Sequence, residues 1–115
     1  MCDINHLTNL IIEFRDAREW KQFHHPKDVA ISLVLEASEV LEHFQWKSKE
    51  EVEAYVRSNA DAIGEELADV LYWVLLLSHD LGIDLFSTFE KKMQRNAEKY
   101  PVDKAKGSHK KYTEL

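Results

Sequence analysis

The chain of 115 residues contains only three glycines, two prolines and one cysteine. So few turn-forming residues, with no sustained alternation of apolar and polar positions, argue against a fold built on β-sheets. The single cysteine, Cys2, excludes a disulfide within the chain and favours a reducing compartment. The first residues lack the basic patch and apolar stretch of a secretory signal, so we expect a cytoplasmic protein.

Long apolar runs are also lacking. The longest, Val70 to Leu77, is far shorter than the roughly 20 residues that cross a bilayer, so we expect a buried helix and no membrane association. The net charge of −6 is unevenly distributed: residues 1–90 carry 18 acids and 7 bases, whereas residues 91–115 carry 3 acids and 8 bases. An acidic body argues against nucleic acid as a partner, while the basic end favours a small phosphorylated ligand.

What remains predicts an all-α fold, a single domain over residues 1–115 built as a bundle of four to five helices. The first two helices are expected over 4–23 and 27–45. A capping box of Ser48 and Glu51 predicts the start of a short third helix, and a fourth is expected over 60–81. Asp84 is expected to cap a fifth helix that runs to about 99, before an irregular basic tail over 101–115. The first helix carries an apolar stripe through Leu7, Leu10, Ile11 and Phe14.

Two pairs of carboxylates lie in the middle of apolar helices. Glu36 and Glu39 are three residues apart, as are Glu66 and Asp69, so the members of each pair share a helix face about 4.5 Å apart along the axis. At ~4 Å and an effective dielectric of ~20, two ionised carboxylates repel by ~4 kcal/mol. Four facing carboxylates therefore predict a bound divalent cation, and oxygen ligands alone favour Mg²⁺, with Mn²⁺ as a substitute.

Either pair alone is more often a solvated helix face, but two pairs within apolar helices favour the metal site. The competing metal site is a di-iron centre, which would need a Glu-x-x-His sequence on two helices. Here His43 follows Glu39 by four residues, and His79 lies outside the second pair. The pattern therefore favours magnesium over a di-iron centre.

Six segments, spread over nearly the whole chain, carry a resemblance to a known family. They are 14–26 (FRDAREWKQFHHP), 35–47 (LEASEVLEHFQWK), 65–70 (EELADV), 82–85 (GIDL), 92–101 (KMQRNAEKYP) and 111–115 (KYTEL). The chain resembles the all-α MazG-like nucleoside triphosphate pyrophosphohydrolases, and within them the dCTP pyrophosphatase subgroup. The metal signature of that family is E-x-x-E followed by E-x-x-D, and here 26 residues separate Glu39 from Glu66.

The resemblance implies a Mg²⁺-dependent enzyme that cleaves a deoxynucleoside triphosphate to monophosphate and pyrophosphate, clearing the nucleotide pool. By motif, Glu36, Glu39, Glu66 and Asp69 correspond to the metal ligands. A water that attacks the α-phosphorus would be oriented by Glu36 or Glu39, between which the sequence does not choose.

The same resemblance assigns the nucleotide contacts. Trp20 and Trp46 correspond to base-pocket tryptophans, although alone each would more often be core. Phe23 and His24 are expected to shape that pocket. Positions spaced by four on the last helix, which share a face, correspond to phosphate and base contacts: Lys92, Asn96 and Tyr100.

Two departures bear on the base. Ile11 stands where the vertebrate-type enzymes have histidine, and Trp73 where they have tyrosine, so we expect dCTP to be favoured with relaxation toward dATP or dUTP. The family forms dimers and tetramers, which implies a homodimer or homotetramer. The apolar helix over 60–81, with Tyr72 and Trp73 filling more than one face, favours cover by another subunit.

Two alternatives remain open. A related enzyme, such as a dUTP diphosphatase or a phosphoribosyl-ATP pyrophosphohydrolase, would share the carboxylates and differ in base selectivity. A non-enzymatic helical interaction module would be expected to lack one or more of the carboxylates. The contexts of Trp20 and Trp46 argue against the first alternative, and the presence of all four carboxylates argues against the second.

Overall fold

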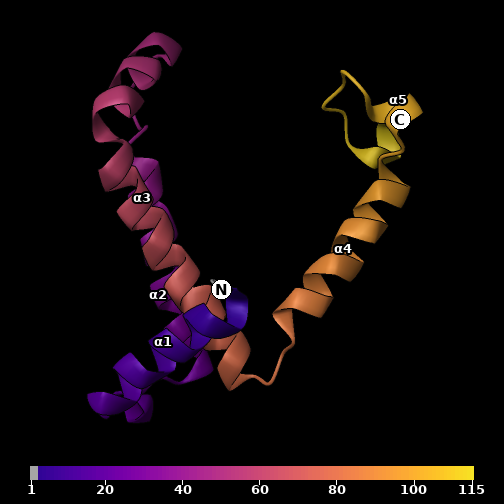
Figure 1. Ribbon diagram of the computed structural model, residues 1–115. Helices are drawn as coiled ribbons and strands as arrows, with labels where there is room; N and C mark the ends of the chain where they lie inside the picture. Colours follow the sequence, from indigo (N-terminus) through magenta and orange to yellow (C-terminus); the bar gives the residue numbers. More distant parts are fainter. Residues whose placement is uncertain (1–2) are drawn as a thin grey trace. The chain divides into compact units, whose positions relative to one another are not determined.

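The computed structural model describes residues 3–115, so the predicted environment of Cys2 lies outside the described residues. The chain divides into two compact units, and the boundary along the sequence lies between Gly82 and Ile83. The first contains the helices α1, α2 and α3, and the second contains α4 and α5 (Figure 1). Within residues 3–115 every regular element is helical and no strand is present, which confirms the predicted all-α class.

Helix α1 spans Ile4–Ala17 and begins at Asp3, whose side chain accepts a hydrogen bond from the backbone N–H of His6 at 2.8 Å. The prediction that this helix continues to residue 23 is wrong. Glu19 adopts a left-handed backbone with φ 54°, which interrupts the helical hydrogen bonds, and the short 3₁₀ helix η1 follows over Lys21–Phe23. The chain therefore turns where an uninterrupted helix was expected.

Helix α2 spans Pro26–Glu42, close to the predicted 27–45. Pro26 occupies its first position, where the missing N–H of proline leaves no hydrogen bond unmade. The helix is followed by a turn over residues 43–46, in which Trp46 takes a left-handed backbone with φ 68°. A bulky residue in that conformation is uncommon and marks the sharp change of direction toward α3.

Helix α3 spans Lys49–Asp80, so the predicted third and fourth helices form one helix with a kink. The capping box is confirmed: Glu51 N–H donates to Ser48 Oγ at 3.2 Å, and Ser48 N–H donates to Glu51 Oε1 at 3.1 Å. The kink lies at Asn59, whose backbone leaves the helical region at φ −125° and ψ 17°. Its side-chain amide donates to Tyr55 O at 2.9 Å, a local bond that competes with the helical pattern.

The first unit is held together by α3, which packs along α2 and against α1 (Figure 1). Its fully buried apolar side chains are Val29 of α2 and the neighbours Leu75 and Leu76 of α3. Arg15 of α1 is also buried, and its Nη1 donates to Asp80 Oδ2 at 2.7 Å. This ion pair fixes the end of α1 to the end of α3.

The second unit begins with α4, Leu85–Lys99, capped as predicted by Asp84, whose side chain accepts from Ser87 N–H at 3.1 Å. The prediction of a wholly irregular tail is wrong. Residues Val102–Ala105 form the one-turn helix α5, and Tyr112–Glu114 form the 3₁₀ helix η2. Tyr112 packs edge to face against Tyr100 at 5.9 Å, which gives these turns something to fold against.

No single helix in residues 3–115 is both long and apolar enough to cross a membrane; only α3 and α4 taken together as a bent pair meet the length and composition that crossing requires.

Candidate functional site

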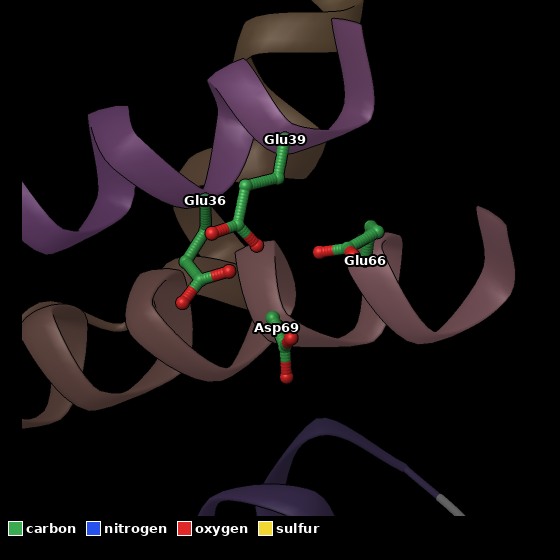
Figure 2. A group of neighbouring side chains, drawn as sticks. All are labelled: Glu36, Glu39, Glu66 and Asp69. Atoms are coloured by element: carbon green, nitrogen blue, oxygen red, sulfur yellow. The ribbon is translucent and has the colours of Figure 1, made fainter. Parts of the chain in front are cut away.

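The two predicted carboxylate pairs face each other across the contact between α2 and α3. Each of Glu36, Glu39, Glu66 and Asp69 offers a carboxylate oxygen, and these oxygens all lie within 4.8 Å of one another. Figure 2 shows Glu36 and Glu39 projecting from α2 toward α3, where Glu66 points back toward Glu39 and Asp69 lies one turn further along α3. The spacing of three residues on both helices, together with the packing of α2 along α3, gathers all four groups.

Two of these carboxylates have oxygens that are both buried and without a hydrogen-bond partner, Glu36 Oε2 and Glu66 Oε2. A buried anionic oxygen without a partner is costly, and such groups in folded proteins are nearly always paired. Three of the four side chains are half-buried, and only Asp69 is exposed. The cluster is therefore an anionic site whose buried oxygens suit a cationic ligand.

The pKa values of the cluster report the same repulsion. Burial, followed by the hydrogen bond and the charge of Glu39, raises the pKa of Glu36, and the contribution from Trp73 opposes this rise. The neighbouring Glu39 carboxyl, with which Glu66 can share a proton, followed by burial and by the charges of the other carboxylates, raises the pKa of Glu66 to about 7. A proton held between carboxylates near neutral pH occupies the place that a cation would take.

The donor set suits a hard divalent cation. Four carboxylates from two rigid helices supply oxygen ligands alone. Mg²⁺ and Mn²⁺ prefer oxygen ligands, whereas zinc sites are usually built from histidine and cysteine. The unpartnered oxygens of Glu36 and Glu66 are the atoms that a cation would satisfy. The residues present therefore fit a metal centre of this kind, while the choice of Mg²⁺ stays a prediction.

A cleft of about 480 Å³ opens beside the carboxylates and is lined by residues of α1, α2 and α3 and of the turn after α1. Glu36 and Asp69 belong to the carboxylate cluster and to the cleft wall at once. The other lining residues are apolar or aromatic: Leu10, Ile11, Phe14, Trp20, Tyr72 and Trp73. A flat, apolar ligand seated here would lie directly next to the anionic cluster.

The aromatic rings of the cleft pack edge to face. Phe14 meets Trp20 at 5.6 Å and Tyr72 at 6.4 Å between ring centroids, and Tyr72 meets Trp73 at 4.9 Å. Such contacts stabilise ring pairs and fix their relative tilt. Phe14 and Tyr72 were not predicted as site residues, because their positions follow the apolar stripes of α1 and α3 and such stripes more often belong to a core.

The predicted base-pocket residues are found in three different places. Trp20 lines the cleft. His24 lies next to a lining residue, edge to face with Trp73 at 5.5 Å, and its buried Nδ1 has no hydrogen-bond partner. Burial and then the charge of Arg15 lower the pKa of His24, which keeps the ring neutral. Trp46 is 91% exposed and is not among the residues that line this cleft.

The predicted contacts on α4 belong to the second unit. Lys92 is exposed, and Asn96 is half-buried with its amide nitrogen 3.8 Å from Met93 Sδ. Tyr100 follows the last turn of α4 and packs against Tyr112. Their roles toward phosphate and base stay predictions.

Comparison with known proteins agrees with this geometry. Residues 31–115 match the MazG-like family. A dCTP pyrophosphatase 1 from Mus musculus is 39% identical over 111 residues, which are 95% of this chain and 65% of that protein. The protein of the same name from Homo sapiens is 37% identical over 111 residues, with the same shares of 95% and 65%. The chain thus spans 65% of the length of these relatives.

A solved structure is similar as well. The crystal structure of a pyrophosphatase from Archaeoglobus fulgidus aligns with a TM-score of 0.81 at 35% sequence identity, covering 88% of this chain and 94% of that one. The sequence match, the all-helical fold and the four gathered carboxylates agree with one another. The chain belongs to the MazG-like family.

Proposed function

We propose that the chain hydrolyses a deoxynucleoside triphosphate to the monophosphate and pyrophosphate, with dCTP favoured, in a Mg²⁺-dependent reaction. The observation that carries this proposal is that Glu36 and Asp69 belong to both the carboxylate cluster and the aromatic cleft. A base stacked in the cleft brings its own triphosphate to the cluster. The named activities of the relatives and of the solved neighbour support the same reaction class.

The four carboxylates would hold a divalent cation close to the triphosphate. A divalent cation there supplies neutralisation of phosphate charge and lowers the pKa of water. Glu36, Glu39, Glu66 and Asp69 fix its position from two helices, so it needs no rearrangement before reaction. Glu36 or Glu39 orients the water that attacks the α-phosphorus by accepting its proton.

The cleft binds the base by stacking more than by hydrogen bonding. Trp20 and Trp73 offer indole faces, and the carboxylates Glu36 and Asp69 are the only charged groups among the lining residues. Ile11, one of the two departures from the vertebrate-type pattern, lines this cleft together with the other, Trp73. Because apolar walls discriminate weakly among bases, we propose dCTP as the preferred substrate with measurable turnover of dATP or dUTP.

The remaining nucleotide contacts come from outside this cleft. We assign Lys92 to phosphate, and Asn96 and Tyr100 to the base and its surroundings, on the basis of the family motif. His24 supports the base pocket from behind Trp73. Trp46, which is almost fully exposed on a strained turn, contributes its ring to a base held by another subunit.

The exposed apolar surface of α2 supports a homodimer or homotetramer. The α2 side chains Val34, Leu35 and Leu41 are 66%, 59% and 60% exposed. Several large apolar side chains exposed on one helix are typical of a surface that another subunit covers. Sedimentation of the purified chain at micromolar concentration tests this: a dimer or tetramer supports the proposal, and a stable monomer contradicts it.

The cell compartment we propose is the cytoplasm, where nucleotide pools are cleared.

Product analysis tests the proposed function. Purified protein is incubated with each deoxynucleoside triphosphate, with Mg²⁺ or with chelator, alongside the variant Glu39→Gln and its exposed neighbour control Glu42→Gln. We expect monophosphate and pyrophosphate, fastest from dCTP, abolished by chelator and by Glu39→Gln but not by Glu42→Gln. Release of single phosphates, or equal rates on all ribo- and deoxynucleotides, would contradict the proposal.

A further inference from the structure

The guanidinium of Arg18 lies against the aromatic wall of the cleft, although Arg18 is not among the lining residues. Its Cζ is 3.8 Å from the ring centroid of Phe14 and 5.9 Å from that of Trp20. Both rings line the cleft. We propose that Arg18 is a positioning residue, which holds the Phe14–Trp20 wall in the orientation that receives a base. This inference rests on the proposed function, because it assumes that the cleft holds the base of a nucleotide.

The guanidinium is fixed from more than one side. Its Nη1 donates a hydrogen bond to Phe14 O at 3.0 Å, so the charged group cannot swing freely into solvent. A planar guanidinium held over a ring face is the favoured geometry of a cation–π contact, and an ammonium does not reproduce it. The guanidinium of Arg18 therefore makes a cation–π contact with the ring of Phe14 and is held there by its hydrogen bond.

The wall needs such support because Trp20 is not on a helix. It follows Glu19, whose left-handed backbone ends α1, and its own N–H reaches back to Arg15 O at 3.2 Å. Trp20 is 41% exposed; its ring meets that of Phe14 edge to face at 5.6 Å, and the guanidinium of Arg18 lies 5.9 Å from its centroid. Removal of Arg18 takes away the cationic neighbour of both rings, so the indole should become more mobile and a base must then order it.

Arg18 acts through the rings, since no direct contact with the carboxylate cluster is available to it among the described residues. If it served the phosphates instead, its removal would weaken substrates with and without a base alike. Inorganic triphosphate, which carries the phosphates but no base, separates the two roles. The comparison of dCTP with inorganic triphosphate is therefore the decisive one.

The kinetic test uses Arg18→Ala, Arg18→Lys and the exposed control Arg57→Ala, which removes an equal charge from α3. A cation–π contact at an exposed site contributes about 0.5 to 1 kcal/mol, which corresponds to about a two- to fivefold change in affinity. We expect Arg18→Ala to raise KM for dCTP by about that factor with kcat little changed. The affinity for inorganic triphosphate should stay the same as in the wild type. Arg18→Lys should fall between, and Arg57→Ala should match the wild type.

A second measurement does not depend on turnover. The chain has three tryptophans, so 5-fluorotryptophan labelling gives three ¹⁹F resonances that single Trp→Phe variants assign. In the nucleotide-free protein, Arg18→Ala should shift and narrow the Trp20 resonance and leave that of Trp46 in place. An unchanged Trp20 resonance, or equal effects on dCTP and inorganic triphosphate, overturns the positioning role. A changed resonance in a protein that cleaves no nucleotide overturns the proposed function and leaves the contact between Arg18 and the wall established.

Discussion

The two halves of the site are built by different means. The carboxylates stand in the middle of α2 and α3, where a spacing of three residues and helix packing fix their positions. The aromatic wall combines α1, the irregular turn that carries Trp20, and α3. The positions of the carboxylates are thus set by rigid helices, whereas the shape of the aromatic half depends on contacts between side chains. Changes to the first half should therefore abolish the reaction, and changes to the second should alter its selectivity.

The largest expected effect comes from removing a charge from the cluster. Glu66→Gln deletes one of the four carboxylates without changing its shape, so the cation is held less tightly and less well placed. Mutation of residues that hydrogen-bond to metal ligands typically lowers metal affinity or activity by about 10- to 100-fold. For a residue that binds the metal directly, we therefore expect kcat/KM to fall by at least about 100-fold. The matched control is Glu65→Gln, next along α3 and exposed, which should stay close to wild type. Equal losses in both would mean that position in the cluster does not matter.

Truncation of the aromatic wall should have a smaller and different effect. Trp20→Ala removes a stacking face that is worth about 1–3 kcal/mol per base, so KM for dCTP should rise by about fivefold to a hundredfold while turnover at saturation persists. Trp20→Phe should retain part of the affinity. Steady-state kinetics with dCTP, dATP and dUTP measures the change. A fall in kcat with unchanged KM would show that the two halves are not separable.

The raised pKa values of Glu36 and Glu66 predict that the stability of the metal-free protein depends on pH. The folded pKa of Glu66, about 7, lies above its ordinary 4.5, and that of Glu36 is also raised. The protonated forms therefore stabilise the folded chain fully below pH about 4.5, and this contribution is lost as pH rises through about 7. Thermal unfolding in chelator should give a Tm that falls over this range.

Two comparisons sharpen that measurement. Saturating Mg²⁺ should restore Tm above pH 7, because a bound cation replaces the proton, and Glu66→Gln should flatten the curve in chelator. A Tm in chelator that rises steadily between pH 5 and 8 would show that the carboxylates do not repel one another in the folded protein.

The smallest expected effect lies away from both halves, at the start of α3. Ser48→Ala breaks the reciprocal capping bonds with Glu51, which also lower the pKa of Glu51. Loss of an N-cap typically costs about 1 kcal/mol in the free energy of unfolding. Urea unfolding should detect this change while kcat/KM stays unaltered. A large loss of activity instead would imply that the first half of α3 takes part in the site.

The predictability of the site follows the same division. The four carboxylates could be predicted because helical spacing alone places each pair, and both capping residues, Ser48 and Asp84, carry their signal in the local sequence. The early end of α1 could not be predicted. It depends on a left-handed backbone at Glu19, whereas the residues that usually adopt this conformation are glycine and asparagine. The joining of two predicted helices across a kink at Asn59 also has no signal in the local sequence.

The aromatic wall was only partly predictable for a related reason. Phe14 and Tyr72 follow apolar stripes that equally suit a core, and only the fold shows that they border an open cleft. Trp20 was identified from its motif, but its support by Arg18 depends on the turn that follows α1. The sequence therefore predicts the carboxylate cluster better than it predicts the aromatic cleft.

A crystal structure with Mn²⁺ and a non-hydrolysable dCTP analogue would locate the metal ion and the base together. Anomalous scattering should place manganese among Glu36, Glu39, Glu66 and Asp69, with the base stacked against the wall of Phe14, Trp20 and Trp73. Manganese at another position, or a base bound away from this wall while the metal occupies the cluster, would contradict the account.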